Sequence, residues 1–158
     1  MSKLGFQVVC ADSAKQKVAA LNAGSAPVQE DGLAELLFAG KERDKLNAVS
    51  DFAEAAVRSN VSILCFESPD TIPEIEQACH AVSTAIKLNS DYHLVIVTSN
   101  IPVGTTAGQL VPLLEQHSGK SAGRDFGVCY MPLFLRNGMA VEVFLHPIIP
   151  ISAMQLKE

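Results

Sequence analysis

The stretch Gly5–Asp12 (GFQVVCAD) decides the fold that we predict for this chain. Its apolar run Val8–Ala11 is typical of a buried parallel strand, and the run ends in the acid Asp12. A capping box that starts at Ser13 predicts a helix over residues 13–22. A strand that leads directly into a helix is the repeating unit of a parallel α/β sheet.

The composition describes a globular chain. Of its 158 residues, 48% are hydrophobic and 18% are charged, which favours one folded α/β domain over a disordered chain. The net charge of −5, without a basic cluster, argues against nucleic acid as a partner. No apolar run approaches the roughly 20 residues of a membrane span, and no signal-peptide pattern opens the chain. We therefore expect no membrane partner and a cytoplasmic location.

The cysteines and histidines are dispersed along the sequence. The four cysteines show no CxxC spacing, so we expect buried, reduced thiols rather than disulfides. The four histidines form no pair with the spacing of metal ligands. The sequence therefore predicts no metal site.

Five further segments alternate with helical patterns along the chain. We expect strands at residues 46–49, 61–66, 93–98, 126–130 and 147–151. Helices are expected to start near Ser13, Asp31, Ser50, Thr71 and Thr106. The run VSILCF at 61–66 is continuously apolar, which is typical of a central strand that is buried on both faces. Together these patterns predict a mostly parallel, three-layer α/β sheet.

Ligands of such sheets bind at the carboxyl ends of the strands. Four strand ends carry polar or turn-forming residues in this sequence: Asp12, Glu67-Ser68-Pro69, Ser99-Asn100 and Met131-Pro132. We therefore expect any ligand site to lie on these four loops.

Six stretches, in this order, carry a likeness to a known family. They are VCADSAKQKVAALNAG (9–24), APVQEDGLAELL (26–37), SDFAEAAVRSNVSILCFESP (50–69), TSNIPVGTT (98–106), SGKSAGRDFGV (118–128) and MPLFLRNGMAVEVFLHP (131–147). They resemble the N-terminal NAD-binding domain of the UDP-glucose/GDP-mannose dehydrogenase family, most closely its GDP-mannose 6-dehydrogenase branch. The likeness covers about residues 5–151 and implies a Rossmann-like fold.

The resemblance also implies a cofactor and its ligands. Enzymes of this family oxidise the C6 alcohol of a nucleotide sugar to a carboxylate and use two NAD per turnover. By resemblance, Asp12 would bind the adenosine ribose of NAD, and Lys17 matches a lysine near the cofactor. Ser68, Ser99 and Asn100 fall on the two loops that follow in the family's cofactor site.

The sequence departs from the family pattern at its chemical positions. The glycine-rich GxGxxG turn does not occur in the 158 residues, and Glu67 stands where the family has a glycine. Leu133 stands where the family has a glutamate, and a leucine cannot transfer a proton. We therefore expect no catalytic residue here, and we describe 1–158 as one truncated Rossmann-like domain without its first strand and glycine-rich turn.

Three functions stay open at this point. The chain could be an NAD-binding domain that is inactive alone, a non-enzymatic interaction or regulatory module, or a binder of small anions at the strand ends. Expected partners are a second copy of the chain or a full-length dehydrogenase. An absent first strand would leave two open edges, so we predict that Val8–Ala11 pairs with Ser62–Cys65 or that a homodimer covers both.

Overall fold

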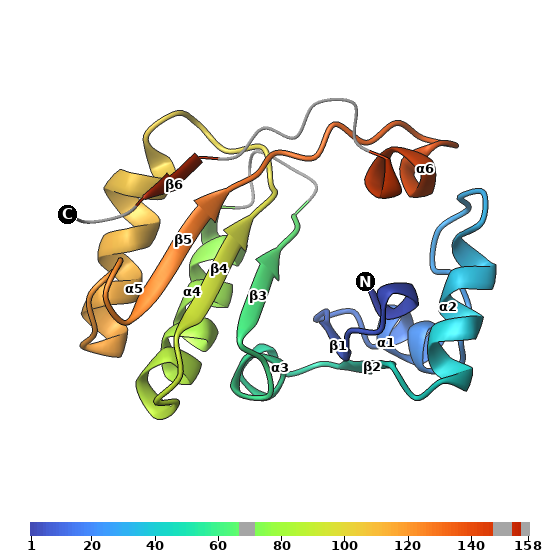
Figure 1. The fold of residues 1–158 in the computed structure, drawn as a ribbon, viewed down its shortest axis with the longest axis horizontal. Helices are drawn as coiled ribbons and strands as arrows, with labels where there is room; N and C mark the ends of the chain where they lie inside the picture. Colours follow the sequence, from blue (N-terminus) through green and yellow to red (C-terminus); the bar gives the residue numbers. More distant parts are fainter. Residues whose placement is uncertain (67–71, 147–152, 156–158) are drawn as a thin grey trace. The chain divides into compact units, whose positions relative to one another are not determined.

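The structure is a computed structural model that describes residues 1–66, 72–146 and 153–155. Six strands and six α-helices alternate along these residues, with two shorter helical turns (Figure 1). In chain order they are η1 (Ser2–Leu4), β1 (Val8–Ala11), α1 (Lys15–Asn22), α2 (Leu33–Glu42), β2 (Leu46–Val49), α3 (Phe52–Val57), β3 (Val61–Leu64), α4 (Ile72–Leu88), β4 (His93–Val97), η2 (Thr106–Leu110), α5 (Val111–Ser118), β5 (Phe126–Tyr130), α6 (Ala140–Leu145) and β6 (Ala153–Gln155).

The chain divides into two compact units. The first unit combines Met1–Ala55 with Phe134–Ile149, and the second combines Ala56–Leu133 with Pro150–Glu158. Each unit contains one sheet, with β1 and β2 in the first and the order β3-β4-β5-β6 in the second. The α/β class and the parallel strands are confirmed, but the strands form two sheets rather than one.

In the first unit, β1 and β2 run parallel, with Val8 opposite Leu46. The Asn22 side chain, at the end of α1, extends this pairing. Its Nδ2 atom donates to the Ala48 carbonyl at 2.8 Å, and its Oδ1 atom accepts from the Ala48 amide at 2.9 Å. One side chain thus satisfies both backbone groups of an edge-strand residue and ties α1 to β2.

In the second unit, β3, β4 and β5 are parallel and β6 is antiparallel to β5. Helices α4 and α5 pack on one face of this sheet (Figure 1). The α4 positions expected to face inward from their helical spacing are all buried, which confirms that prediction: Ile75, Ala78, Cys79, Val82, Ala85 and Ile86.

The prediction that the 61–66 run is buried on both faces is wrong. Val61 is 46% exposed and Ile63 is 37% exposed, whereas Leu64 is buried. Side chains alternate between the two faces of a strand, so Val61 and Ile63 share the face opposite Leu64. Because α4 and α5 pack on one face of this sheet, the continuously apolar sequence does not produce two buried faces.

The predicted pairing of Val8–Ala11 with Ser62–Cys65 is also wrong. Strand β1 pairs with β2 and strand β3 pairs with β4, and no bridge joins the two sheets within 1–66, 72–146 and 153–155. Strands β1 and β3 each pair with the strand that follows next in the chain. The strand expected at 147–151 lies outside the described residues. Strand β6 follows that range, at Ala153–Gln155.

Helix starts differ from the predictions by one residue in two cases. The Asp12 Oδ1 atom accepts from the Ala14 amide at 2.8 Å, and the side chain of Ser13 makes no cap of α1. The Asp51 Oδ1 atom accepts from the Ala53 amide at 2.8 Å, at the start of α3, where Ser50 was expected. A carboxylate competes well for these amides because it is charged.

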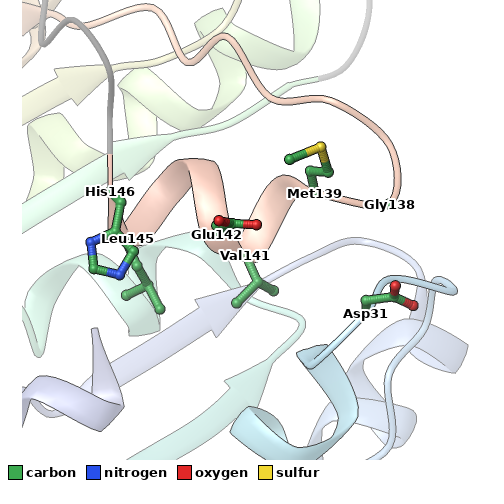
Figure 2. Close-up of a pocket in the computed structure, with 7 residues that line it drawn as sticks. All are labelled: Asp31, Gly138, Met139, Val141, Glu142, Leu145 and His146. Carbon is green, nitrogen blue, oxygen red and sulfur yellow. The ribbon is translucent and has the colours of Figure 1, made fainter.

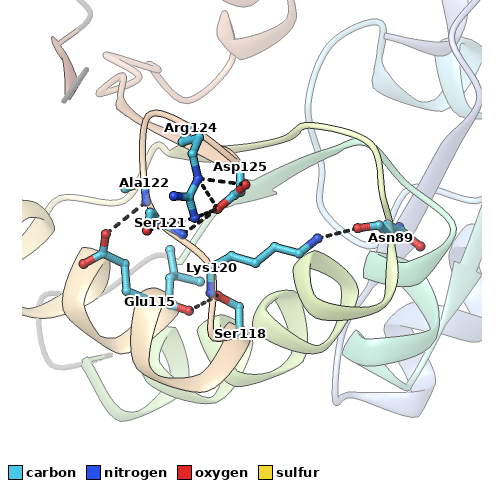
Figure 3. A network of polar contacts seen from close by, with 9 residues as sticks. Asn89, Glu115, Ser118, Lys120, Ser121, Ala122, Arg124 and Asp125 are labelled. Carbon is cyan, nitrogen blue, oxygen red and sulfur yellow. Dashed lines mark hydrogen bonds and ion pairs between the residues drawn. The ribbon is translucent and has the colours of Figure 1, made fainter. Parts of the chain in front are cut away.

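The polar turn predicted after α5 is confirmed, and it is closely held (Figure 3). The Lys120 Nζ atom donates to the Asn89 carbonyl at 2.5 Å, which ties the turn to the residue after α4. Glu115 accepts from the Ala122 amide at 3.0 Å, and Asp125 accepts from the Ser121 amide at 2.9 Å. These contacts fix the end of α5 against the end of α4.

No helix in the described ranges is long and apolar enough to cross a membrane. The cytoplasmic location stays a prediction. All four cysteines lie in the described residues and none forms a disulfide with another. Cys79 and Cys129 are buried as expected, but Cys65 is exposed.

Candidate cofactor site

Asp12 lies at the carboxyl end of β1, where the sequence placed the ribose ligand. Its Oδ1 atom accepts from the Ala14 amide, and its Oδ2 atom lies 3.4 Å from the Lys17 Nζ atom. The Asp12 side chain is 33% exposed and that of Lys17 is 51% exposed. The carboxylate is therefore oriented by the Ala14 amide, and it can still accept a hydrogen bond from the hydroxyl group of a ligand.

Lys17 is the third residue of α1, which begins at Lys15, and the start of the helix brings its ammonium group near Asp12. The Asp12–Lys17 ion pair is open to water and contributes little to stability. Its chemical effect is to place a carboxylate acceptor beside an ammonium donor. Such a pair can bind the hydroxyl groups of a sugar, since the carboxylate accepts hydrogen bonds and the ammonium group donates them.

Ser99 follows β4 at the carboxyl end of the second sheet, and its side chain is buried. Its Oγ atom accepts from the Phe66 amide at 2.8 Å and donates to the Leu64 carbonyl at 3.2 Å. Thr98 donates to the same Leu64 carbonyl at 2.9 Å. The Ser99 hydroxyl thus joins the ends of β3 and β4, and its role in the described residues is to shape this strand end.

Asn100 is exposed and opens the loop that leads to η2. Gly104 turns this loop with a φ of +89°, and the Thr105 amide then donates to the Pro102 carbonyl at 3.1 Å. The loop therefore presents the Asn100 amide side chain to solvent. Ser68 and Glu67 lie outside the described residues.

The segment after β5 belongs to the first unit although it follows the second in sequence. Glu30 holds it in place, because its carboxylate accepts from the Gly138 amide at 2.9 Å and the Ala140 amide at 2.6 Å. These two bonds start α6. Leu133, where the resemblance expects an acid, precedes this segment and is half-buried.

A hollow of about 430 Å³ lies beside α6 in the first unit (Figure 2). Its wall combines two acids, one imidazole and apolar side chains: Asp31, Gly138, Met139, Val141, Glu142, Leu145 and His146. This hollow lies in the stretch 131–147 that carries the family likeness. It was not predicted, because Asp31 and α6 are distant in sequence.

Two side-chain relationships were missed by the sequence reasoning. Asp31 was expected to cap α2, but the residue before that helix is Gly32, with a φ of +76° and no side-chain cap. The dispersed sequence positions of the histidines also did not indicate that the rings of His80 and His117 lie 4.0 Å apart between their centroids. The start of α2 is a local feature, whereas tertiary packing alone brings His80 and His117 together.

Comparison with known proteins identifies the family of the chain. Residues 1–149 match the family described as the UDP-glucose/GDP-mannose dehydrogenase family, NAD binding domain. The chain belongs to this family. GDP-mannose 6-dehydrogenase of Pseudomonas aeruginosa is 35% identical over 153 residues, which cover 93% of this chain and 35% of that protein. UDP-glucose 6-dehydrogenase of Haloferax volcanii is 34% identical over 154 residues, covering 92% of this chain and 35% of that protein.

Solved structures of this family share the fold. A ternary complex of GDP-mannose dehydrogenase from Pseudomonas aeruginosa superposes with a TM-score of 0.92 at 32% identity, covering 98% of this chain and 37% of that one. UDP-glucose dehydrogenase from Pyrobaculum islandicum gives a TM-score of 0.88 at 29% identity, covering 97% of this chain and 36% of that one. The chain thus spans about a third of the length of these dehydrogenases.

The residues present fit one part of the family's cofactor. The Asp12 carboxylate stands at a strand end and is partly exposed, which suits an acceptor for ribose hydroxyl groups. A pyrophosphate is normally bound by a GxGxxG turn at a helix start, and that pattern does not occur in the 158 residues. The likeness to the dehydrogenase family therefore supports NAD as a cofactor by resemblance.

Proposed function

We propose that this chain forms part of the NAD site of a nucleotide-sugar 6-dehydrogenase. Alone, the chain binds NAD weakly or not at all and catalyses no oxidation. The observation that carries the proposal is the Asp12 carboxylate, which is oriented by the Ala14 amide and open to solvent beside Lys17. A strand-end acid so placed is the ribose ligand of dinucleotide-binding domains. NAD, when bound, would supply the hydride acceptor.

The other proposed contacts lie on the loops of the second unit. By the family likeness, Ser68, Ser99 and Asn100 match the two loops that follow in the family's cofactor site. Ser99 would act indirectly, by fixing the shape of the strand end, because its hydroxyl group is already hydrogen-bonded to Phe66 and Leu64. Asn100 would donate or accept directly, since it is exposed.

Titration with NAD, followed by amide shifts in NMR spectra, tests the cofactor part. We expect a dissociation constant of about 1 mM or weaker, which is about −4 kcal/mol. Asp12→Asn should remove the residual shifts. Asp51→Asn is a matched control, because Asp51 caps α3 by the same 2.8 Å bond that Asp12 makes at α1.

Two results would contradict this part of the proposal. A low-micromolar dissociation constant would show that the chain holds the pyrophosphate without a GxGxxG turn. Equal shifts in the wild type and in Asp12→Asn would show that Asp12 is not the ribose ligand.

Catalysis by the chain alone is not expected. Leu133 replaces the acid that the family likeness places there, and the chain covers about a third of the P. aeruginosa enzyme. NADH absorbance should not rise with GDP-mannose or UDP-glucose at high protein concentration. Leu133→Glu should not rescue turnover, and a clear gain from that one change would refute the assignment.

A second function, an interaction module, rests on β3. This strand bonds β4 along one edge, no described strand pairs with its other edge, and Val61 and Ile63 are exposed beside it. An unpaired edge beside an exposed apolar face favours a second copy of the chain. Light scattering should detect a dimer that Ile63→Lys dissociates, whereas Leu88→Lys, at an exposed leucine of α4, should not. A monomer at high concentration would exclude this function.

A further inference from the structure

His80 and His117 form an unexpected pair on two packed helices. His80 lies on α4 and His117 lies in the last turn of α5, and both side chains are exposed. Their ring centroids are 4.0 Å apart, and the planes are tilted by 57°. The two rings therefore lie close together without stacking in parallel.

The backbone under this pair is held rigidly. Cys79, next to His80, and Leu114, three residues before His117, are completely buried in the hydrophobic core. Beyond His117, the Lys120 Nζ atom bonds the Asn89 carbonyl, so the end of α5 is tied to the residue that follows α4 (Figure 3). Two ligands on fixed elements lose little conformational entropy when they bind a common ion.

We propose that His80 and His117 together bind one divalent transition-metal ion of the Ni²⁺, Cu²⁺ or Zn²⁺ class. Imidazole is a preferred ligand of these ions. Two imidazoles that share an ion at metal–nitrogen distances of about 2.1 Å have ring centres roughly 5 Å apart. The observed 4.0 Å reaches that value by a small rotation of two exposed side chains.

The electrostatic setting favours a cation at this position. His117 is in the last helical turn of α5, where the partial negative charge of the helix end attracts positive charge. The whole chain carries a net charge of −5. No third His, Cys, Asp or Glu completes a metal cluster within the part of the chain that the structure describes. Water would therefore fill the remaining positions, and the ion would be exchangeable.

Titration of the untagged 158-residue chain with Ni²⁺ tests the site. Ni²⁺ is paramagnetic, so the ring proton signals of ligating histidines broaden as it binds. We expect the signals of His80 and His117 to broaden together, at about tenfold lower Ni²⁺ than the signal of His146, an exposed histidine of the first unit. Ni²⁺ should also raise the melting temperature.

Single replacements separate a shared ion from two independent ones. His80→Asn and His117→Asn should each weaken Ni²⁺ binding about tenfold or more, and the double replacement should lose little beyond either one. His146→Asn is the control and should leave the joint broadening unchanged. The proposal is overturned if His80 and His117 broaden independently, or only at the concentration that affects His146. Circular dichroism confirms that each variant is folded.

Discussion

Glu30 and Gly138 are 108 residues apart in the chain, and the Glu30 Oε2 atom accepts a hydrogen bond from the Gly138 amide at 2.9 Å. The other carboxylate oxygen accepts from the Ala140 amide at 2.6 Å. One side chain thus holds two amides, on either side of Met139, at the start of α6. The hollow beside α6 depends on this contact, because Gly138 and Asp31, the neighbour of Glu30, both line it.

Replacing Glu30 should release this segment. Glu30→Ala removes both acceptors and should lower the free energy of unfolding by about 1–3 kcal/mol, since bonds to a carboxylate are stronger than neutral ones. Amide exchange at Gly138 and Ala140 should accelerate. Glu35→Ala, at an acid in the first turn of α2, is the control for lost charge. Unchanged exchange at both amides would contradict the role given to Glu30.

Asn22 offers a second test of a long-range contact. Asn22→Ala removes both bonds to the Ala48 backbone and should destabilise the chain by about 1–3 kcal/mol. Urea unfolding measures this loss. Asn137→Ala, at an exposed asparagine, should stay within about 0.5 kcal/mol of the wild type. Equal effects of the two replacements would argue against the tie between α1 and β2.

His93 predicts a loss of stability in acid. Burial lowers the pKa of His93 below its ordinary value of 6.5, and Ser62 Oγ lies 2.9 Å from its Nε2 atom. The unfolded chain then binds the proton more readily, so the free energy of unfolding should fall as the pH drops below about 6.5. His93→Gln should flatten this slope, and His146→Gln should not. An NMR titration that gives His93 a pKa above 6.5 would refute the prediction.

Cys79 predicts the opposite behaviour in alkali. Burial, with a smaller effect of the Glu76 carboxylate, raises the pKa of the Cys79 thiol from 9.0 to about 12. The unfolded chain loses this proton first, so the free energy of unfolding should fall between pH 9 and about pH 12, by up to about 1.4 kcal/mol per pH unit. Cys79→Ala should reduce this slope, whereas Cys10→Ala should retain it. Identical slopes in all three proteins would disprove the assignment.

The elements with strong local signals were predictable. The helical spacing of α4 and the apolar runs of β1, β4 and β5 identified these elements, because burial of one helix face or of a strand leaves a periodic pattern. Family likeness was also predictable from ordered motifs. Asp12 was found as a strand-end acid, but its bond to the Ala14 amide was not predicted, and the capping box expected at Ser13 does not form.

The errors arise where distant segments decide the outcome. The exposed face of β3 depends on which helices cover the sheet, and the apolar run at 61–66 contains no information on that. The contact of His80 with His117 joins two helices through packing alone. Glu30 and Gly138 have no local signal at all, since neither residue type predicts its partner.

The bond between Glu30 and Gly138 has a consequence for synthesis. The first unit is interrupted by the second, so the ribosome must add 108 residues after Glu30 before the Gly138 amide that donates to its carboxylate exists. At roughly 5–20 residues per second, this delay lasts about 5–20 s. Strand β1 thus leaves the ribosome before the second unit does, yet its own unit is completed only after most of the second unit has emerged.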